Sequence, residues 1–515
     1  MSLERNDRPW LASLLFVGCL TLGLFALTAH RFTGGRFGVP LDDAWIHFQF
    51  ARNLARGDGF SFNPGQPTAG STAPLWTLLL AGVRLVGGEF PAAGQVLSAV
   101  CFLAALVTTY ALGKRLTGSR WAAWLSGAIV ATNGRFVWAG LSALEMCLFA
   151  TLSLLATAAH LSDQAAGRYR LGTAALFGLA ALARPEGYLL FALALTASIW
   201  NTIPLTFHAS RFTLHVSRLT SHALRLLLPV ALFAAIVCPY LIFSLHTSGH
   251  LLPNTYHAKA AFDFRPSLDS LSVAAQYLIL DNPILLPFYV LGLGILLRRV
   301  PLVGLWSTSL PLAYAFLHIV PYHHGRYLMP LIPCNSIISV VGLLEARRSV
   351  ARRRPSLSAS GRGLAALASL FVLAGTGWRL PAMAHLYAWN VDNINEMHVA
   401  LGHWVADHTP PGALLALNDI GAITYISERP VIDLAGLVTP EVVPILRSPN
   451  RDARLAEFMA ERGVRYVIIF PAWFPDLAAR RDLLRPVHQV TLEHNTICGG
   501  QTMVVYRAHW CESRW

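Results

Sequence analysis

Long apolar runs without charged residues alternate with short polar segments over most of the chain. The runs cover residues 10–30, 92–113, 121–134, 226–258, 301–325 and 327–344. Several exceed the roughly 20 residues that a helix needs to cross the hydrocarbon core of a bilayer. The first run is longer than the core of a signal peptide and no small-residue cleavage site follows it. The pattern therefore predicts a membrane protein with many helical spans, the first of them retained.

Two further apolar stretches depart from simple spanning. Residues 74–87 are short and are interrupted by Arg84, so we expect them to lie on the outer face or to re-enter it. Residues 171–201 are broken by the polar segment 183–187, which predicts two short spans with a polar tip at the outer surface. Irregular backbone at membrane depth is tolerated only where protein or water covers it. Together the runs predict about eleven spans.

The pattern changes near residue 380, where short helix and strand signals begin to alternate. Helices are expected at 393–407 and 451–462, the second of which ends at Gly463. Strands are expected at 414–418, 431–434, 464–470, 487–492 and 503–506. The predicted fold is therefore a polytopic α-helical membrane module, residues 1–380, followed by a soluble α/β domain, residues 381–515.

Composition agrees with lipid as the main solvent of the chain. The 515 residues are 54% hydrophobic and only 13% charged, with a mean hydropathy of +0.49, whereas soluble domains carry about 25% charged residues. The net charge of +13 is unevenly placed. Six alternate loops together hold 18 Lys and Arg against 4 Asp and Glu, namely 1–9, 114–120, 161–170, 202–225, 298–299 and 345–362.

This asymmetry predicts the orientation of the chain. Positive residues concentrate in cytoplasmic loops, so we expect the N-terminus in the cytoplasm and the C-terminal domain outside an inner (plasma) membrane. The chain after residue 378 is balanced, with 12 basic and 14 acidic residues. The basic charge is explained by topology, and no nucleic-acid partner is needed.

Ionisable groups are costly in a membrane protein and tend to mark function. Here they gather in segments expected outside, beginning with the first outer loop, residues 30–73. The candidates are Asp42, Asp43, Glu145, Arg184, Glu186, Asn254, Lys259, His323, His324, Arg326 and Tyr327. Because unrelated helix caps would not all choose one side, this convergence is the signal that predicts a site.

Each candidate also has a structural interpretation. Asp42 or Asp43 could act as a general base or bind a cation, or could cap the helix expected at 44–55, which places His47 one turn away. Lys259, one of two lysines, and Arg326 could hold a phosphate or extend to the interface. Arg184 could pair with Glu186, and Glu145 could cap a helix.

Cysteines and histidines give no metal signature. Five of the seven cysteines lie in apolar runs, while Cys498 and Cys511 fall in the exported tail, where a disulfide is an open alternative. The histidines repeated every seven residues in 205–225 read as a basic insertion on the inner leaflet. No metal ligand is assigned, and dependence on a divalent cation is left open.

The order of these motifs resembles a known family. The segments that carry the resemblance are 41–46, 51–60, 62–66, 70–76, 144–145, 183–187, 252–255 with Lys259, 325–327, 418–422 and 432–437. In this order they are similar to the GT-C superfamily of membrane glycosyltransferases that use polyprenyl-phosphate sugars, and most closely to its arabinofuranosyl- and mannosyltransferases. The block in the first outer loop is the most specific.

The resemblance implies an inverting transfer of a sugar from a polyprenyl-phosphate donor to a glycan, lipid or protein acceptor of the cell envelope. Asp42 or Asp43 would serve as general base, and Glu145 would be the second acidic residue. Lys259, Arg326 and Arg184 would neutralise the leaving phosphate, with Asn254, His324 and Tyr327 in the same donor site. The alternative is a lipid or glycan transporter, although the chain shows no internal repeat of the kind transporters often carry.

Overall fold

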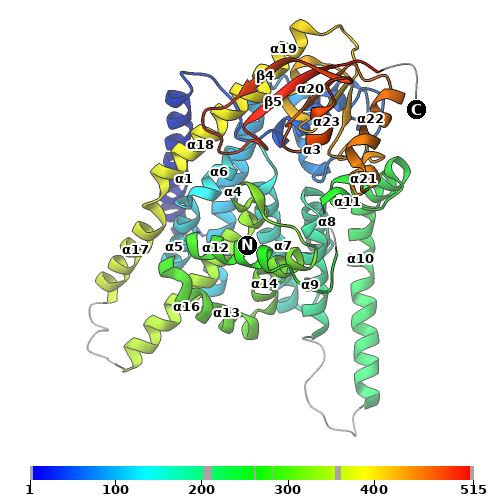
Figure 1. The fold of residues 1–515 in the computed structure, drawn as a ribbon. Helices are drawn as coiled ribbons and strands as arrows, with labels where there is room; N and C mark the ends of the chain where they lie inside the picture. Colours follow the sequence, from blue (N-terminus) through cyan, green and yellow to red (C-terminus); the bar gives the residue numbers. More distant parts are fainter. Residues whose placement is uncertain (1–3, 201–211, 260–261, 282, 354–360, 511–515) are drawn as a thin grey trace.

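The computed structural model describes residues 4–200, 212–259, 262–281, 283–353 and 361–510 of the chain. It is predominantly helical. Figure 1 shows a helical bundle with a small five-stranded sheet and its helices gathered at one end. The polytopic membrane fold with a C-terminal sheet domain is therefore confirmed.

Within the described residues, six helical segments are long and apolar enough to cross a membrane. They are Arg5–Phe32, Ala92–Thr117, Met146–Ala166, Leu226–Ser248, Tyr322–Arg353 and Leu367–His408, and the bent pair Leu268–Asp281 with Pro283–Arg299 would make a seventh. The corresponding helices include α1 (Arg8–Phe32), α4 (Ala92–Thr117), α7 (Met146–Ala166), α10 (Phe212–Ser248), α12 (Leu268–Asp281), α13 (Leu286–Arg299), α16 (Ile332–Arg353) and α17 (Gly361–Gly377).

The difference from the expected eleven lies in helix length. The other apolar runs form shorter helices: α5 (Arg120–Ala131), α8 (Leu171–Ala183), α9 (Glu186–Trp200) and α14 (Pro301–Phe316). At 1.5 Å per residue, a helix of 12 to 16 residues covers about 18–24 Å, which is less than the hydrocarbon core of about 30 Å. The break between α8 and α9 at Arg184 and Pro185 is as predicted.

Several short elements form the end of the bundle that meets the sheet. They are α2 (Asp43–Arg56), α3 (Pro74–Leu85), α6 (Gly134–Gly140), α11 (Asn254–Lys259), α15 (Tyr322–Gly325) and the 3₁₀ helix η4 (Arg326–Leu331). The helix expected at 44–55 is α2, and it ends at Gly57 in the left-handed conformation, with φ +90°. Helix α3 has 12 residues, too few to cross a bilayer upright.

The C-terminal domain contains all five expected strands. They are β1 (Leu415–Leu417), β2 (Val431–Asp433), β3 (Tyr466–Ile469), β4 (Leu484–Thr491) and β5 (Thr502–Ala508), in the order β2-β1-β3-β5-β4. Strands β2, β1 and β3 are parallel, whereas β5 runs antiparallel to both β3 and β4. Strands β1 and β2 are buried along their length, as parallel strands covered on both faces require.

Helices surround this sheet and connect it to the bundle. They are α18 (Leu380–Ile394), the π-helix η6 (Asn395–Val399), α19 (Ala400–His408), α20 (Gly421–Ser427), α21 (Val442–Leu446), α22 (Arg451–Glu461) and α23 (Pro475–Ala479). The predicted helices 393–407 and 451–462 correspond to η6 with α19 and to α22. Gly463 ends α22 with φ +69°, as expected of a glycine stop.

Helices α13 and α16 approach each other through reciprocal glycines. A Cβ on Gly292 would collide with the carbonyl oxygen of Ile338, and a Cβ on Gly342 would collide with that of Phe288. Neither obstacle is a flexible side chain, so only a shift of the helix backbone could relieve either clash. Small residues at such crossings let helices pack closely where lipid supplies no hydrophobic driving force.

We therefore predict that Gly292→Ala destabilises the protein by about 1–3 kcal/mol, the usual cost of overpacking a core. Thermal unfolding in detergent, followed by tryptophan fluorescence, measures the effect. Gly294→Ala is the matched control on the same helix, because a Cβ there would meet no atom within 4 Å. Equal transition temperatures for the two variants would contradict the proposed close contact.

Candidate active site

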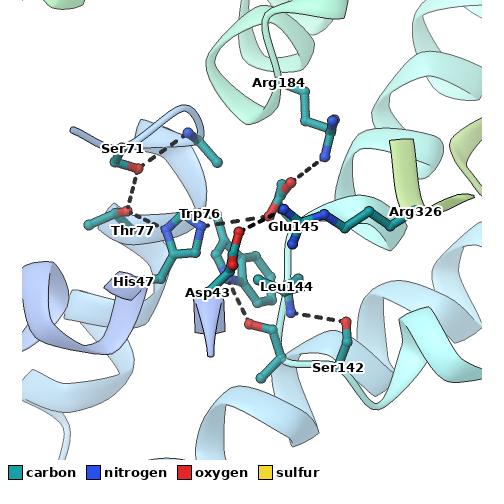
Figure 2. A network of polar contacts seen from close by, with 12 residues as sticks. Asp43, His47, Ser71, Trp76, Thr77, Ser142, Leu144, Glu145, Arg184 and Arg326 are labelled. Atoms are coloured by element: carbon teal, nitrogen blue, oxygen red, sulfur yellow. Dashed lines mark hydrogen bonds and ion pairs between the residues drawn. The ribbon is translucent and has the colours of Figure 1, made fainter. Parts of the chain in front are cut away.

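A cavity of about 380 Å³ lies between the membrane bundle and the C-terminal domain. One side is polar and is formed by Asp43, His47, Glu145, Arg184, Glu186 and Arg326. The lining also has apolar residues, which include Leu189, Leu310, Leu317 and Ile319. Figure 2 shows the charged side chains converging from α2, from the start of α7, from the α8–α9 break and from η4. Such a cavity suits a ligand with one charged and one apolar part.

Asp43 is the first residue of α2, and its carboxylate faces Arg326. The Arg326 Nη2 atom donates a hydrogen bond of 2.7 Å to Asp43 Oδ2. The arginine side chain is only 7% exposed, whereas the aspartate is 34% exposed. The cation is therefore buried and neutralised, and the carboxylate is the more accessible partner of the pair (Figure 2).

An unusual turn brings Arg326 to this position. His323, His324 and Gly325 have φ values of +50°, +60° and +68°, a left-handed region that non-glycine residues rarely adopt. At Gly325 a Cβ would lie 2.5 Å from the ring of Tyr277 and 2.7 Å from Arg135 Nη2, so only glycine fits there. The strained turn ends α15 and directs the next residue, Arg326, into the cavity.

Glu145 and Glu186 hold a second buried guanidinium. Arg184 donates to Glu145 through Nη1 and to Glu186 Oε1 through Nη2 at 2.6 Å. The hydroxyl of Tyr314 also donates to Glu186. Among the described residues the cavity thus contains three carboxylates, from Asp43, Glu145 and Glu186, and two guanidiniums.

His47 links this charged cluster to the loop before α3. Its Nε2 lies 3.7 Å from Glu145 Oε2, and its Nδ1 shares a hydrogen bond of 3.2 Å with Thr77 Oγ1. Thr77 in turn lies 3.1 Å from Ser71 Oγ. Burial lowers the pKa of His47 below its ordinary value, so the imidazole is neutral at neutral pH.

Asp42 points elsewhere, although it is adjacent to Asp43. It accepts hydrogen bonds of 2.8 Å from the backbone N–H groups of Gly421 and Ala422, in the first turn of α20. Burial raises the pKa of this carboxyl to about 6. Asp42 occupies the N-cap position of α2 but makes no cap hydrogen bond there, so the interpretation of Asp42 as a cap of its own helix is wrong. It binds the N-terminus of a helix in the other domain.

Two further predicted site residues lie outside the cavity wall. His324 Nε2 pairs with Asn390 Oδ1 of α18 at 2.9 Å, because the left-handed turn directs it away from Arg326. Asn254 is buried at the start of α11, where its N–H donates to the carbonyl oxygen of Ala69 at 3.2 Å. Neither lines the cavity, and their place in the donor site stays a prediction.

Of the remaining residues singled out in the sequence, one lines the cavity and most of the others have side chains outside the described part of the structure. Tyr327 lines the cavity, and its ring lies 5.0 Å from the guanidinium carbon of Arg326 and 5.4 Å from that of Arg184. Lys259 ends α11, and its side chain lies outside the described part of the structure. The side chains of the basic insertion 205–225 and Cys511 also lie outside the described part, while Cys498 is a free thiol.

The sequence did not reveal that the C-terminal domain forms part of the cavity wall. Leu437 reaches the cavity from the loop after β2. The Asp433 carboxylate holds that loop by accepting hydrogen bonds from the N–H groups of Ala435, Leu437 and Val438. An apolar side chain in a distant loop gives no functional signal, so only the folded arrangement could identify this wall.

Known proteins resemble this chain in fold more than in sequence. A domain of unknown function (DUF8728) matches residues 389–510. No curated protein matches the sequence. Among solved structures, ArnT from Cupriavidus metallidurans in the apo state is similar with a TM-score of 0.59 at 15% identity, over 95% of this chain and 97% of that chain.

Two other solved structures have the same overall fold. ArnT from Cupriavidus metallidurans bound to undecaprenyl phosphate gives a TM-score of 0.59 at 14% identity, over 95% of this chain and 97% of that one. The Archaeoglobus fulgidus oligosaccharyltransferase in complex with Zn and sulfate gives 0.53 at 14% identity, over 95% and 73%. The chain described here therefore shares its overall fold with ArnT and with the oligosaccharyltransferase.

Proposed function

We propose that the protein is a membrane glycosyltransferase that moves a sugar from a polyprenyl-phosphate donor to a hydroxyl group of a cell-envelope acceptor. The observation that carries the proposal is the cavity whose lining combines Asp43, two buried guanidiniums and several apolar side chains. The similarity to an ArnT structure bound to undecaprenyl phosphate supports this choice of donor.

The charged and the apolar residues that line the cavity match the phosphate and the isoprenoid chain of such a donor. Arg326 and Arg184 would bind the phosphate, since guanidinium groups bind phosphate oxygens in a bidentate manner. Leu310, Leu317 and Ile319 would contact the first isoprenoid units. Because Arg326 is paired with Asp43 before the donor arrives, phosphate binding would release the carboxylate from its cation.

Asp43 is placed to act as the general base of an inverting transfer. Its carboxylate would take the proton of the acceptor hydroxyl while the acceptor oxygen forms a bond to the anomeric carbon. The bond between that carbon and the phosphate oxygen would break on the opposite side, and polyprenyl phosphate would leave with the bonding electron pair. Arg326 and Arg184 would stabilise the charge that develops on the phosphate.

Glu145 is better suited to orient Arg184 than to react with the substrate. It binds Arg184 directly and lies within 3.7 Å of the imidazole of His47. We therefore assign it a positioning role for the phosphate-binding arginine. Among the described residues no group of three or more His, Cys, Asp or Glu side chains is arranged to hold a metal ion. Loss of transfer upon treatment with a chelator would establish a requirement for a divalent cation.

The proposed orientation places the N-terminus in the cytoplasm and the cavity on the non-cytoplasmic face. It is supported by the 18 basic and 4 acidic residues of the loops assigned to the inside. We predict that alkaline phosphatase fused after residue 510 is active in a bacterial host, while green fluorescent protein at the same place is dark. The reverse pair of results would place the cavity on the cytoplasmic side.

Separate substitution of the two neighbouring aspartates by asparagine distinguishes a loss of catalysis from a loss of contact between the domains. We predict that Asp43→Asn lowers kcat for sugar transfer by about 10²–10⁴-fold, the usual contribution of a positioned base, in addition to the stability lost with its ion pair to the buried Arg326. Asp42→Asn should lower the transition temperature without a comparable loss of kcat, because it weakens two buried hydrogen bonds to α20. The assay follows a radiolabelled sugar from polyprenyl phosphate into membrane acceptors; full transfer by a folded Asp43→Asn enzyme would exclude Asp43 as the base.

Substitution of the buried arginine tests the donor site. Arg326→Gln removes the cation and its ion pair with Asp43, so we predict a large loss of both donor affinity and kcat. Arg326→Lys keeps the charge without the planar fork and should recover part of the activity. The exposed Arg454→Gln serves as a control with the same charge change. If donor KM and kcat of Arg326→Gln match the control, Arg326 does not bind the phosphate.

The rival function is lipid or glycan transport. A transporter would move a labelled polyprenyl-phosphate sugar across a vesicle membrane without cleaving it. The proposed enzyme would release polyprenyl phosphate in proportion to glycosylated acceptor. Product analysis by thin-layer chromatography therefore distinguishes the two functions in one experiment.

A further inference from the structure

A second cavity, of about 350 Å³, lies at the far end of α2 from Asp43. Its wall consists of Arg52, Ala55, Arg56, Arg84, Leu85, Gly87 and Glu89, none of which lines the first cavity. Nine residues separate Asp43 from Arg52, which at 100° per residue puts them on opposite faces of the helix. The second cavity is therefore a separate site.

Arg52 forms a fixed floor of this second cavity. Its side chain is buried, with Nη1 donating to the carbonyl oxygen of Tyr425 and to Glu428 Oε1, each at 2.8 Å. The guanidinium carbon also lies 4.1 Å from the centre of the Tyr425 ring. Within the described part of the chain, the buried Arg52 Nε has no hydrogen-bond partner. A rigid cation with an unsatisfied donor is typical of an anion site.

Arg56 and Arg84 line the same cavity, and both are more exposed than Arg52. Arg56 is 51% exposed and pairs at 3.1 Å with Glu428, which is also exposed. Arg84 is 29% exposed and pairs with the exposed Glu89. Exposed ion pairs of this kind contribute only about 0–1 kcal/mol. A phosphate group can therefore take both guanidiniums from their carboxylates at little cost.

The surroundings of the cavity indicate where the phosphate comes from. Next to Arg84, the end of α3 presents Leu85 and Val86, which are 70% and 86% exposed. On an apolar helix of a membrane protein, such side chains contact lipid rather than water. Guanidiniums directly beside lipid-facing side chains are the arrangement found at the headgroup level of a bilayer.

Stabilisation of the helix ends explains only part of this cluster. Arg56 and Arg84 lie in the last turns of α2 and α3, where positive side chains interact favourably with the helix dipole. That effect does not account for an open cavity whose wall carries three cations. A ligand with two or more acceptor oxygens explains this arrangement.

We propose that this second cavity binds the phosphate of an anionic membrane phospholipid, whose acyl chains extend along α3. The bound lipid would link the C-terminal ends of α2 and α3, because its phosphate would contact Arg52 and Arg56 of the first helix and Arg84 of the second. The proposal concerns lipid binding alone and stands whether or not the first cavity transfers a sugar.

The test measures lipid binding to the full-length protein in detergent, without donor or acceptor. Phosphatidylglycerol, zwitterionic phosphatidylcholine and inorganic phosphate are each titrated, and thermal stability and native mass spectra are recorded. We expect phosphatidylglycerol to raise the transition temperature of the wild type and to remain bound in the spectra. Arg56→Gln with Arg84→Gln should weaken its apparent affinity about tenfold, as expected from the loss of two charge-assisted contacts.

Matched variants make the outcome decisive. The control Arg454→Gln with Arg480→Gln removes two exposed arginines from the C-terminal domain and should respond like the wild type. Glu89→Gln with Glu428→Gln removes the competing carboxylates and should strengthen lipid binding. An unchanged response of the Arg56 and Arg84 variant would overturn the site. An equal effect of inorganic phosphate or phosphatidylcholine at the same concentration would overturn its assignment to an anionic lipid.

Discussion

The carboxylate of Asp42, bound to the first N–H groups of α20, fixes the two halves of the molecule relative to each other. Its two hydrogen bonds link positions that are 379 and 380 residues apart in the chain. Successive Cα atoms are 3.8 Å apart, so the joint also fixes the start of α2 and thereby Asp43. The position of the proposed base thus depends on contact with the C-terminal domain.

The charges of the first cavity obey a related constraint. A buried ion without a partner costs several kcal/mol, and both guanidiniums of the cavity are paired within the protein. Arg326 binds Asp43, and Arg184 binds Glu145 and Glu186. Entry of a phosphate would therefore be an exchange of partners rather than the first neutralisation of a bare cation. Asp43 is the most exposed of the three carboxylates that pair with these arginines. Binding of the phosphate to Arg326 would therefore release this carboxylate.

Local patterns in the sequence predicted the elements but not their alignment. The apolar runs and all five strands were recognisable because hydrophobic periodicity is a local property. The choice between Asp42 and Asp43 could not be made locally, since it depends on Gly421 and on Arg326, which lies 283 residues from Asp43. His324 illustrates the same limit, because a left-handed turn separates its direction from that of Arg326 two positions later.

The number of membrane spans was also difficult to predict from the sequence. An apolar run reveals that a segment avoids water, but its helix length depends on where the backbone breaks. The break between α8 and α9 could be located from a proline and two charged residues. The ends of α5 and α14 depend on packing against neighbouring helices, which apolar composition alone does not encode.

The joint between the two domains also limits how the C-terminal domain can vary. Asp42 binds backbone N–H groups, and these are present whatever side chains α20 carries, so most of that helix can change without loss of the joint. Gly421 is the exception, because a Cβ there would collide with the carbonyl oxygen of Asp42 itself. Gly70 has the same role on the other side of the contact, since its Cβ would lie 2.6 Å from Val438 Cγ1 and 2.8 Å from the Leu437 carbonyl oxygen. The two glycines therefore permit the close approach of two domains that both contribute to the cavity wall.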